Sequence, residues 1–472
     1  MLGGRLAKRA FAPAARPLHL RHATRFYSTP AEAPTAEPAP KKKSTKKKKT
    51  KEIKRTDEPT AEPTAEPTPE ATTTTAEPTP KKKSTEKKKT KEIKRTDEPK
   101  APPAPLDASL VLIDTRKKRT HHPRDLEFGS FCTDNMLSIK WHRNAGWYQP
   151  TIKPYRKILL QPAASVLQYA FTCFEGLKAY KGTDGRVRLF RPELNAQRFL
   201  KSAQRLGLPS FDPVEFLKLI HRLVSLEHGE VPEKRGSALY LRPVLFGTSS
   251  SLLVNTPSSA RMLTMCSPVG PYHATGFKPI ALEATSSAVR AWPGGVGDMK
   301  LGANYAPTAV PQRDAASRGY QQNLWLFGEQ DYITEAGTMN FFVAIRNKET
   351  GQNELITPPL DGLILEGITR LSILELARQR LVPENWKVLE RRITMKEVED
   401  AAKEGRLLEA FATGTAAVIC PLESISWQNK KIACGLAKDD KAGPITQRLK
   451  DLIEGIQFGD EEHSWAQVVQ PE

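Results

Sequence analysis

The sequence predicts an α+β protein with two mixed domains and a site between them, preceded by a disordered N-terminal region. From Leu110 onward, strand-like and helix-like segments follow one another without the regular alternation of a doubly wound sheet. A stretch rich in turn residues, PVGPYHATGF, lies near the middle of this part at residues 268–277. Residues 28–104 contain almost no large apolar side chains and therefore cannot build a core.

Residues 1–27 have the composition of a mitochondrial transit peptide. They contain six lysines and arginines, whereas the first acidic residue of the chain is Glu32. Their apolar residues are interspersed rather than gathered into a membrane-length run. The run RFYST at residues 25–29 resembles the cleavage site of a matrix protease, with the cut after Tyr27. We therefore expect import into the mitochondrial matrix, with a disordered basic tail as the alternative.

Residues 28–104 are expected to form a disordered linker. KKKSTKKKKTKEIKRTDEP at residues 41–59 recurs with one change at residues 81–99. Each copy holds a single isoleucine, so two copies cannot stack a hydrophobic core as a solenoid does. The repeat is therefore predicted to be a solvated spacer.

Most of the net charge of +19 belongs to this tail. Residues 1–104 hold 26 basic and 13 acidic side chains, whereas the rest of the chain holds 46 and 40. A basic tail could touch membranes or nucleic acid, but the folded part is not expected to bind nucleic acid. No run of about eighteen apolar residues predicts a membrane span. The five scattered cysteines show no metal-ligand spacing and fit a reducing compartment.

Residues 105–269 are expected to form a smaller N-terminal domain. Residues 154–182 alternate short apolar runs with turns, as strands do, and Asp184-Gly185 is a hairpin signal. Helices are predicted over residues 193–209 and from Asp212-Pro213 onward, the second with a cap and a first-turn proline. Residues 238–247 and 261–270 are strand-like.

An interdomain loop at residues 270–276 is expected to lead into a larger cofactor-binding domain, residues 277–472. Its strand-like segments begin at residue 280, where one precedes a glycine-rich run, and continue at residues 321–328, 333–347 and 354–360. Helices are predicted over residues 369–381, 395–405 and 445–459.

The stretch AWPGGVGDMKLGANY, residues 291–305, is the first candidate for chemistry. Its four glycines allow a ligand to approach the backbone closely. A partly desolvated lysine such as Lys300 is more readily neutral, and a neutral amine can bond to an aldehyde cofactor or a carbonyl substrate. Taken alone, a surface lysine in a flexible loop is the simpler interpretation, and Lys278 is the nearest alternative.

Five further motifs accompany this stretch: FEGLKAYKG (174–182), RLFRPELNAQRF (188–199), ITEAGTMNFF (333–342), LEGITR (365–370) and ATGTAAVICP (412–421). In this order and at these separations, they resemble the branched-chain amino acid aminotransferases. That family uses pyridoxal 5′-phosphate on the scaffold called fold type IV. The resemblance covers roughly the last three-quarters of the chain.

The resemblance assigns the cofactor to named residues. Lys300 would hold the aldehyde and shuttle a proton, Glu335 would face the pyridine nitrogen, and Tyr305 would bond the ring oxygen. Without the motifs, Glu335 would be an ordinary turn residue and Tyr305 a core side chain. The phosphate is assigned to one arginine, a helix start and a threonine hydroxyl: Arg198 (with Arg191 as a nearby rival), Ile368, Thr369 and Thr415.

The resemblance also assigns the substrate pocket. Arg242 would bind the distal carboxylate of glutamate or 2-oxoglutarate, as a bidentate guanidinium can. The backbone amides of Thr415 and Ala416 would take the α-carboxylate. The remaining substrate-binding residues implied by the family are Tyr169, Phe174, Tyr240 and Thr338. For the aromatic residues and Arg242, structural packing is the alternative.

One departure from the family concerns a thiol switch. Some animal members carry a redox CxxC near the GTA motif, whereas Ala417 and Cys420 occupy the matching positions here. We therefore expect no such switch.

The resemblance implies a homodimeric enzyme whose pocket is partly closed by the neighbouring subunit. It would transfer the amino group of leucine, isoleucine or valine to 2-oxoglutarate in a ping-pong reaction that yields glutamate. The alternatives are another fold type IV enzyme, such as a D-amino acid aminotransferase or an aminodeoxychorismate lyase, or a non-catalytic protein tethered by its basic tail. The direction of flux and the preference among the three amino acids stay open.

Overall fold

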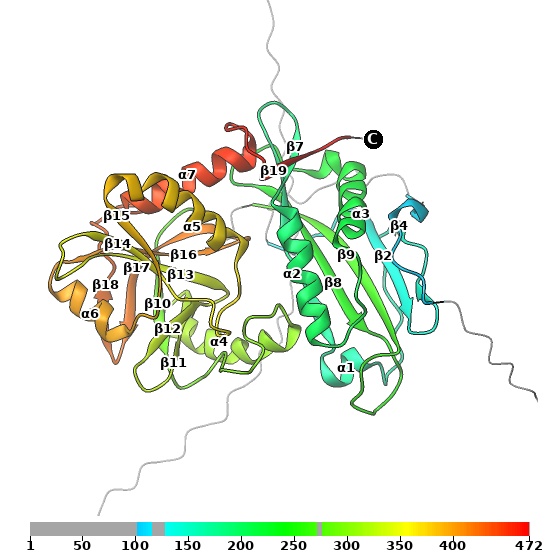
Figure 1. Cartoon of the computed structure of the whole chain (residues 1–472), viewed down its shortest axis with the longest axis horizontal. Coiled ribbons are helices and arrows are strands. Elements are labelled where there is room, and N and C mark those ends of the chain that lie inside the picture. The colour runs from blue at the N-terminus through cyan, green and yellow to red at the C-terminus, as the bar shows by residue number, and fades with distance from the viewer. Residues whose placement is uncertain (1–101, 116–127, 271–275, 472) are drawn as a thin grey trace, which may run out of the picture. The chain divides into compact units, whose positions relative to one another are not determined.

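The computed structural model describes residues 102–115, 128–270 and 276–471. All of them lie in one compact unit, Arg95–Glu472. The predicted transit peptide and nearly all of the predicted linker lie outside the described residues. Within them, helices and mixed sheets confirm the predicted α+β class (Figure 1).

The first sheet has ten strands among the described residues. Its order is β1-β4-β2-β9-β8-β6-β7-β19, with β3 beside β2 and β5 beside β8. All pairs are antiparallel except β1 with β4. The strands are β1 (Leu112–Ile113), β2 (Asn135–His142), β3 (Gly146–Trp147), β4 (Thr151–Pro154), β5 (Thr172–Phe174), β6 (Leu177–Lys181), β7 (Val187–Phe190), β8 (Ala238–Gly247), β9 (Ser259–Val269) and β19 (Ala466–Val469).

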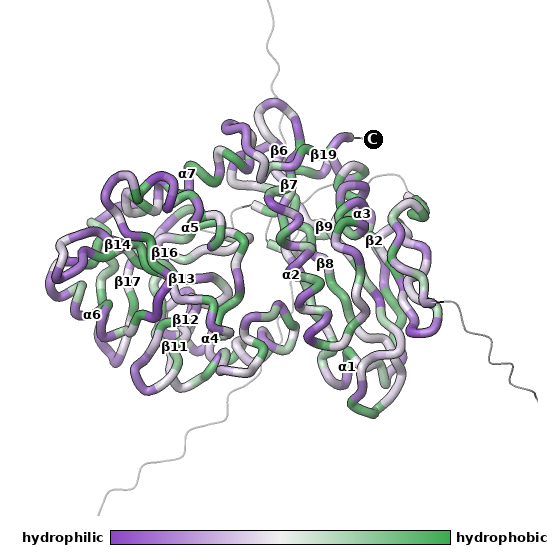
Figure 2. The backbone as a smooth tube through the Cα atoms, viewed as in Figure 1, coloured by the Kyte–Doolittle hydropathy of each residue, from purple (hydrophilic) through white to green (hydrophobic). Residues whose placement is uncertain are grey.

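Two helices, α2 (Pro192–Arg205) and α3 (Pro213–Leu226), cover one face of this sheet (Figure 1). Both begin with proline, and the Asp212 side chain accepts from the Val214 amide as the predicted cap. Figure 2 shows hydrophobic and hydrophilic stretches alternating along both helices, as expected for helices half-buried on a sheet. Phe199 and Phe216 are fully buried in the shared core.

The second sheet has nine strands among the described residues. Its order is β12-β11-β10-β17-β16-β13-β14-β15, with β18 beside β17. Because β12 also pairs with β13, six of these strands form a closed ring around an apolar interior. The strands are β10 (Ile280–Thr285), β11 (Gln322–Phe327), β12 (Tyr332–Ala336), β13 (Met339–Arg346), β14 (Asn353–Thr357), β15 (Trp386–Glu390), β16 (Leu407–Gly414), β17 (Val418–Trp427) and β18 (Lys430–Ala433).

The other helices are α1 (Ser165–Tyr169), α4 (Ala309–Ser317), α5 (Ile368–Arg380), α6 (Met395–Lys403) and α7 (Pro444–Phe458). Short 3-10 turns are η1 (Ala108–Leu110), η2 (His228–Glu230), η3 (Gly302–Asn304), η4 (Ala306–Thr308) and η5 (Val382–Glu384).

Three local expectations differ from the structure. α1 lies inside residues 154–182, which were expected to hold strands and turns, and α4 was not predicted. The strand-like run at residues 333–347 is a hairpin of β12 and β13, which turns at Gly337 with a φ of 60°. A left-handed backbone of this kind favours glycine, which explains why the chain reverses there.

The C-terminal segment joins the two sheets. α7 packs against strands of both, and Leu449, Ile453 and Ile456 share one apolar cluster with Tyr180 of β6 and Phe342 of β13. Beyond α7, β19 pairs with β7 (Figure 1). The division into two domains at residues 270–276 stays a prediction. If the chain divides there, β19 belongs to the larger domain and pairs with a strand of the smaller one.

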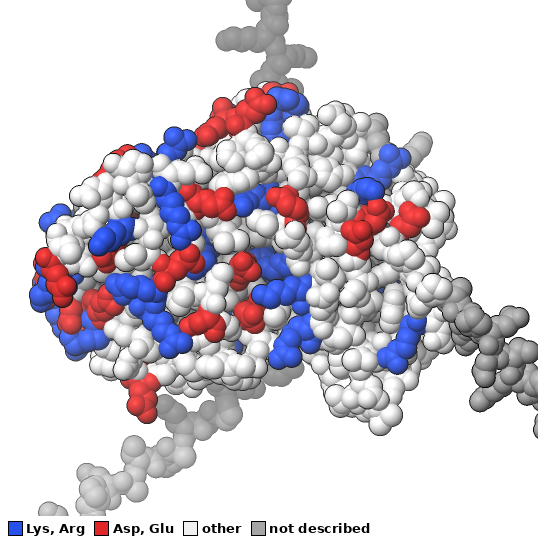
Figure 3. Space-filling view, viewed as in Figure 1, with Lys and Arg blue, Asp and Glu red and all other residues white. Residues whose placement is uncertain are grey.

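On the face shown in Figure 3, basic and acidic side chains are interspersed. Among the described residues, no helix is long and apolar enough to span a membrane.

Candidate active site

A cavity of about 420 Å³ collects side chains from both sheets. Its walls come from β5, β8 and α2 on one side, and from β12, β13, the start of α5 and the turn between β16 and β17 on the other. Twelve of the thirteen predicted site residues line it: Lys300, Arg198, Tyr305, Glu335, Ile368, Thr369, Thr415, Phe174, Tyr240, Arg242, Thr338 and Ala416. Of these twelve residues, Phe174 and Ala416 lie furthest apart in the sequence, 242 positions from each other.

Hydrogen bonds hold both the backbone and the side-chain amine of Lys300 in place. Its amide donates to Ser202 Oγ of α2 at 3.0 Å, and its carbonyl oxygen accepts from the amide of Phe174 at 3.1 Å. The Nζ atom donates to the Tyr305 hydroxyl at 3.2 Å and lies 5.0 Å from the centroid of the Phe174 ring. The amine is therefore presented to the cavity from a rigid base.

Glu335 on β12 is buried and ion-paired. Arg290 lies 2.6 Å from its Oε2, while the Asn340 side chain and the Leu365 amide donate to Oε1 at 3.1 and 3.0 Å. Burial raises the pKa of Glu335, and the Arg290 charge offsets only part of that effect. A cationic ring nitrogen placed beside this carboxylate would offset more of it.

Arg198 on α2 is held by a carboxylate that the sequence analysis did not single out. Its Nε and Nη2 atoms donate to the two oxygens of Glu175 at 2.7 and 2.9 Å, and Nη1 donates to the Glu366 carbonyl at 2.9 Å. Burial opposes ionisation of Glu175, but Arg198 outweighs it, so the pKa of Glu175 is lowered. These contacts use three of the five N–H groups of Arg198, which leaves two for a phosphate.

The rival arginine lies elsewhere. Arg191 pairs with Glu375 at 2.9 Å, donates to Ser372 Oγ at 3.1 Å and covers the Trp465 ring. It does not line the cavity. The geometry therefore favours Arg198 for the phosphate.

The start of α5 offers backbone amides to the cavity. Ile368 and Thr369 are its first residues, and the cap residue Gly367 has no side chain to satisfy them. A Cβ at Gly367 would lie 2.0 Å from Asn340 Oδ1, so a larger residue there would displace the Asn340 side chain from its hydrogen bonds to Glu335 and the Leu365 carbonyl. An open helix N-terminus of this kind suits a phosphate.

Aromatic rings and one arginine form the opposite wall. Arg242 donates to the Tyr240 hydroxyl at 3.0 Å and lies over the rings of Phe174 and Tyr240. Phe128, which the sequence analysis did not select, packs edge-on against Tyr240 with ring centroids 4.8 Å apart. The wall therefore offers an apolar surface with one reachable guanidinium.

Two turns complete the cavity. Thr338 lies in the turn between β12 and β13, and Thr415 and Ala416 lie in the turn between β16 and β17. These turn residues line the same cavity as the aromatic wall, as their predicted role on the substrate side requires.

Tyr169 is the predicted residue that the structure does not bring into the cavity. It ends α1, is 39% exposed, and donates its hydroxyl to the carbonyl of Leu252. Its role stays a prediction.

The donor set of the cavity fits pyridoxal phosphate. The amine of Lys300 matches its aldehyde, the phenol of Tyr305 its ring oxygen and the buried carboxylate of Glu335 its ring nitrogen. Arg198 and the open N-terminus of α5 match its phosphate.

Comparisons with known proteins agree with this fit. The family described as amino-transferase class IV matches residues 172–425. The cytosolic branched-chain-amino-acid aminotransferase of Saccharomyces cerevisiae is 50% identical over 369 residues, which cover 78% of this chain and 98% of that protein. The mitochondrial enzyme of the same yeast is 51% identical, with 75% and 91% covered.

Solved structures match as well. A branched-chain aminotransferase from Thermoproteus uzoniensis, solved with norvaline, has a TM-score of 0.56 at 25% identity and covers 71% of this chain and 99% of that one. The T.th. branched-chain amino acid aminotransferase, solved with pyridoxamine 5′-phosphate, has a TM-score of 0.55 at 24% identity and also covers 71% of this chain and 99% of that one. At this identity, the match supports the fold only.

The chain belongs to the class-IV aminotransferase family. The yeast relatives place it among the branched-chain-amino-acid aminotransferases of that family. This confirms the resemblance, the fold type and the enzyme class predicted from the sequence.

Proposed function

We propose that this protein reversibly transfers the amino group of leucine, isoleucine or valine to 2-oxoglutarate, with pyridoxal phosphate as its cofactor. The observation that carries the proposal is the cavity itself, in which Lys300, Glu335, Arg198 and Arg242 meet. Both half-reactions would use this one cavity, as a ping-pong reaction requires.

Bound pyridoxal phosphate supplies an electron sink for the charge that develops at the substrate α-carbon. Lys300 Nζ takes the proton from that carbon when the substrate donates its amino group. In the reverse half-reaction it returns a proton to the same carbon. The Tyr305 hydroxyl, 3.2 Å from Nζ, orients the amine. Glu335 would hold the ring nitrogen of the bound cofactor, and the Arg290 charge favours its ionised form against the burial that raises its pKa.

The substrate side of the cavity offers different groups to a branched alkyl chain and to a distal carboxylate. The rings of Phe174 and Tyr240 contact a branched alkyl chain, and Arg242 lies over both rings for the distal carboxylate of 2-oxoglutarate. Its contact with the Tyr240 hydroxyl keeps the guanidinium hydrogen-bonded when leucine is bound.

The decisive experiment compares the wild-type protein with Lys300→Ala. The wild-type holoenzyme is expected to convert leucine and 2-oxoglutarate to glutamate, and its cofactor absorption band is expected to shift with leucine and return with 2-oxoglutarate. Lys300→Ala abolishes both changes. Lys278→Ala is the matched control, because Lys278 lines a neighbouring cavity and not this one. Equal turnover by wild type and Lys300→Ala would contradict the proposal.

The same assay separates the alternatives. A D-amino acid aminotransferase would act on D-leucine rather than L-leucine, and an aminodeoxychorismate lyase on neither. A non-catalytic protein would show no turnover in the wild type.

We also propose a homodimer in which Tyr169 reaches the substrate pocket of the partner subunit. Its neighbourhood carries exposed apolar side chains, Leu167, Leu252 and Leu253, which are 59–68% exposed and suit an interface. Sedimentation gives the mass in solution, and Tyr169→Ala is expected to raise the KM for leucine while leaving cofactor binding unchanged. A monomer with full activity would contradict this arrangement.

Mitochondrial import, directed by residues 1–27, is proposed as well. The relatives include both mitochondrial and cytosolic enzymes. Expression of the chain with and without residues 1–27, followed by fractionation, tests the role of the segment. We expect the full chain in the matrix and the shortened chain in the cytosol.

A further inference from the structure

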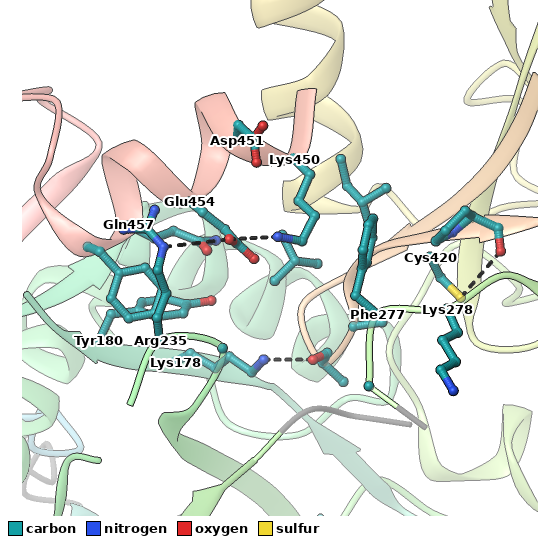
Figure 4. A pocket seen from close by; sticks show the side chains of 18 residues that line it. Lys178, Tyr180, Arg235, Phe277, Lys278, Cys420, Lys450, Asp451, Glu454 and Gln457 are labelled. Atoms are coloured by element: carbon teal, nitrogen blue, oxygen red, sulfur yellow. Dashed lines mark hydrogen bonds and ion pairs between the residues drawn. The ribbon is translucent and has the colours of Figure 1, made fainter. Parts of the chain in front are cut away.

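Figure 4 shows a second cavity, of about 470 Å³. Both cavities are lined by Ala416 and Ala417, in the turn between β16 and β17. This turn is therefore a wall with space on both sides. Ala417 packs against the apolar core of the second sheet, whereas Ala416 offers only a methyl group for packing.

One buried side chain holds this wall from behind. Lys178 on β6 is only 5% exposed, and its Nζ donates to the Ala416 carbonyl oxygen at 2.6 Å, as Figure 4 shows. Lys178 lies directly opposite Tyr240 in the pairing of β6 with β8, so its own backbone is fixed by the sheet. The contact thus ties the turn of the second sheet to β6, the strand that pairs with the one carrying Tyr240.

We infer that Lys178 is a positioning residue that fixes the turn at Thr415–Ala417 for binding of the substrate α-carboxylate. The inference rests on the proposed function and on the assignment of the Thr415 and Ala416 amides to that carboxylate. In a trans peptide the carbonyl and the amide point in opposite directions. Holding the Ala416 carbonyl toward Lys178 therefore fixes the peptide plane that follows Ala416 and restricts the backbone of the residue whose own amide, with that of Thr415, is assigned to the carboxylate.

The charges around Lys178 make this contact sensitive to pH. Burial lowers the pKa of Lys178 to about 8, and Glu454 only partly opposes that effect. Glu454 is shared, because Lys450 lies 2.7 Å and Arg235 3.9 Å from it. The titratable and charged groups that line the same cavity are Tyr180, Arg235, Lys278, Cys420, Lys450, Asp451 and Glu454. Above about pH 8, Lys178 loses its charge and the contact weakens.

The test uses the full-chain holoenzyme with Lys178→Met and Lys178→Arg. The probes are 4-methylvaleric acid, which carries a carboxylate, and isopentylamine, which does not. Lys178→Met is expected to weaken binding of the acid about tenfold, the size of one charged hydrogen bond, and to raise the KM for leucine similarly. Binding of isopentylamine and the cofactor absorption band stay unchanged, and Lys178→Arg restores part of the acid binding.

The wild type provides a second measurement that does not depend on the folding of a variant. The carboxylate of 4-methylvaleric acid stays ionised well above its pKa, so weaker acid binding above about pH 8 reports on the protein. Lys178→Met lacks this change.

The outcomes separate this inference from the proposed function. Unchanged acid binding in a folded Lys178→Met protein, equal losses for acid and amine, or pH-independent acid binding by the wild type would overturn the inference alone. Absence of leucine turnover by the wild type would overturn the proposed function.

Discussion

Arg290 and Glu335 form a buried ion pair at 2.6 Å, with side chains 8% and 6% exposed. The arginine also donates to the carbonyl oxygens of Gly297 and Leu363 at 3.1 Å each. It therefore connects the glycine-rich loop before Lys300 with β12 and with the segment that leads into α5. The pair organises three parts of the cavity at once.

Arg290→Met should remove the one cation paired with Glu335 among the described residues. Breaking a buried pair in this way costs about 3–5 kcal/mol of unfolding free energy, and the carboxyl then favours its neutral form. We expect weaker pyridoxal phosphate binding by equilibrium dialysis and a lower urea midpoint. Arg318→Met is the matched control, because its pair with Glu283 is exposed and should leave both quantities unchanged. An Arg290→Met protein with wild-type cofactor affinity would contradict the role of the pair.

The raised pKa of Glu335 makes a prediction for the cofactor-free protein. The folded state binds this proton more tightly than the unfolded state does. The contribution of Glu335 to stability is therefore largest below its ordinary pKa and is lost as pH rises through the raised one. Urea unfolding between about pH 5 and pH 8 measures the effect. As pH rises, the wild type should lose unfolding free energy relative to Glu335→Gln. A difference that stays constant with pH would contradict this prediction.

Glu175 predicts the opposite pH dependence. Its pKa is lowered in the folded state, so its contribution is present above the ordinary value and is lost as pH falls through the lowered one. Glu175→Gln leaves Arg198 without its carboxylate and should cost about 3–5 kcal/mol near neutral pH. Urea unfolding of wild type and variant should converge in acid. If the gap between them widened in acid, the assignment of the shift to Arg198 would be wrong.

Local signals explain which elements could be predicted from the sequence. The helices α2 and α3 carry proline at their first position, and Asp212 caps α3, so the sequence marks their starts. The short helix α4 contains Pro311 and has no side-chain cap, so it lacks these signals. The pairing of β19 with β7 joins residues more than 270 positions apart, and no local pattern encodes it.

The site shows the same division between local motif and distant partner. Lys300, Glu335 and Arg198 were found because each lies in a continuous motif. Glu175 lies within the motif at residues 174–182 and Arg290 directly precedes the stretch 291–305, yet neither was predicted as a site residue. Each acquires its role from burial beside an opposite charge in another segment, 23 and 45 residues away, and only the fold supplies that partner.

Arg242→Gln should separate the two substrates. Arg242 lies over the rings of Phe174 and Tyr240, where a distal carboxylate and a branched alkyl group would occupy the same space. Loss of a charge-assisted hydrogen bond raises the KM for 2-oxoglutarate by about 10- to 100-fold. The KM for leucine should stay within about threefold, because leucine presents no carboxylate to this arginine.

Steady-state kinetics with each substrate varied in turn measures this split. Tyr240→Phe is the matched control, since it removes only the hydroxyl that accepts from Arg242 at 3.0 Å and keeps the ring. We expect it to raise the KM for 2-oxoglutarate by less than Arg242→Gln does. Equal increases for leucine and 2-oxoglutarate in Arg242→Gln would mean that the arginine shapes the aromatic wall and does not bind the distal carboxylate. A larger increase in KM for 2-oxoglutarate than for leucine would show that the charge of Arg242 distinguishes the two substrates, because both contact the same aromatic wall.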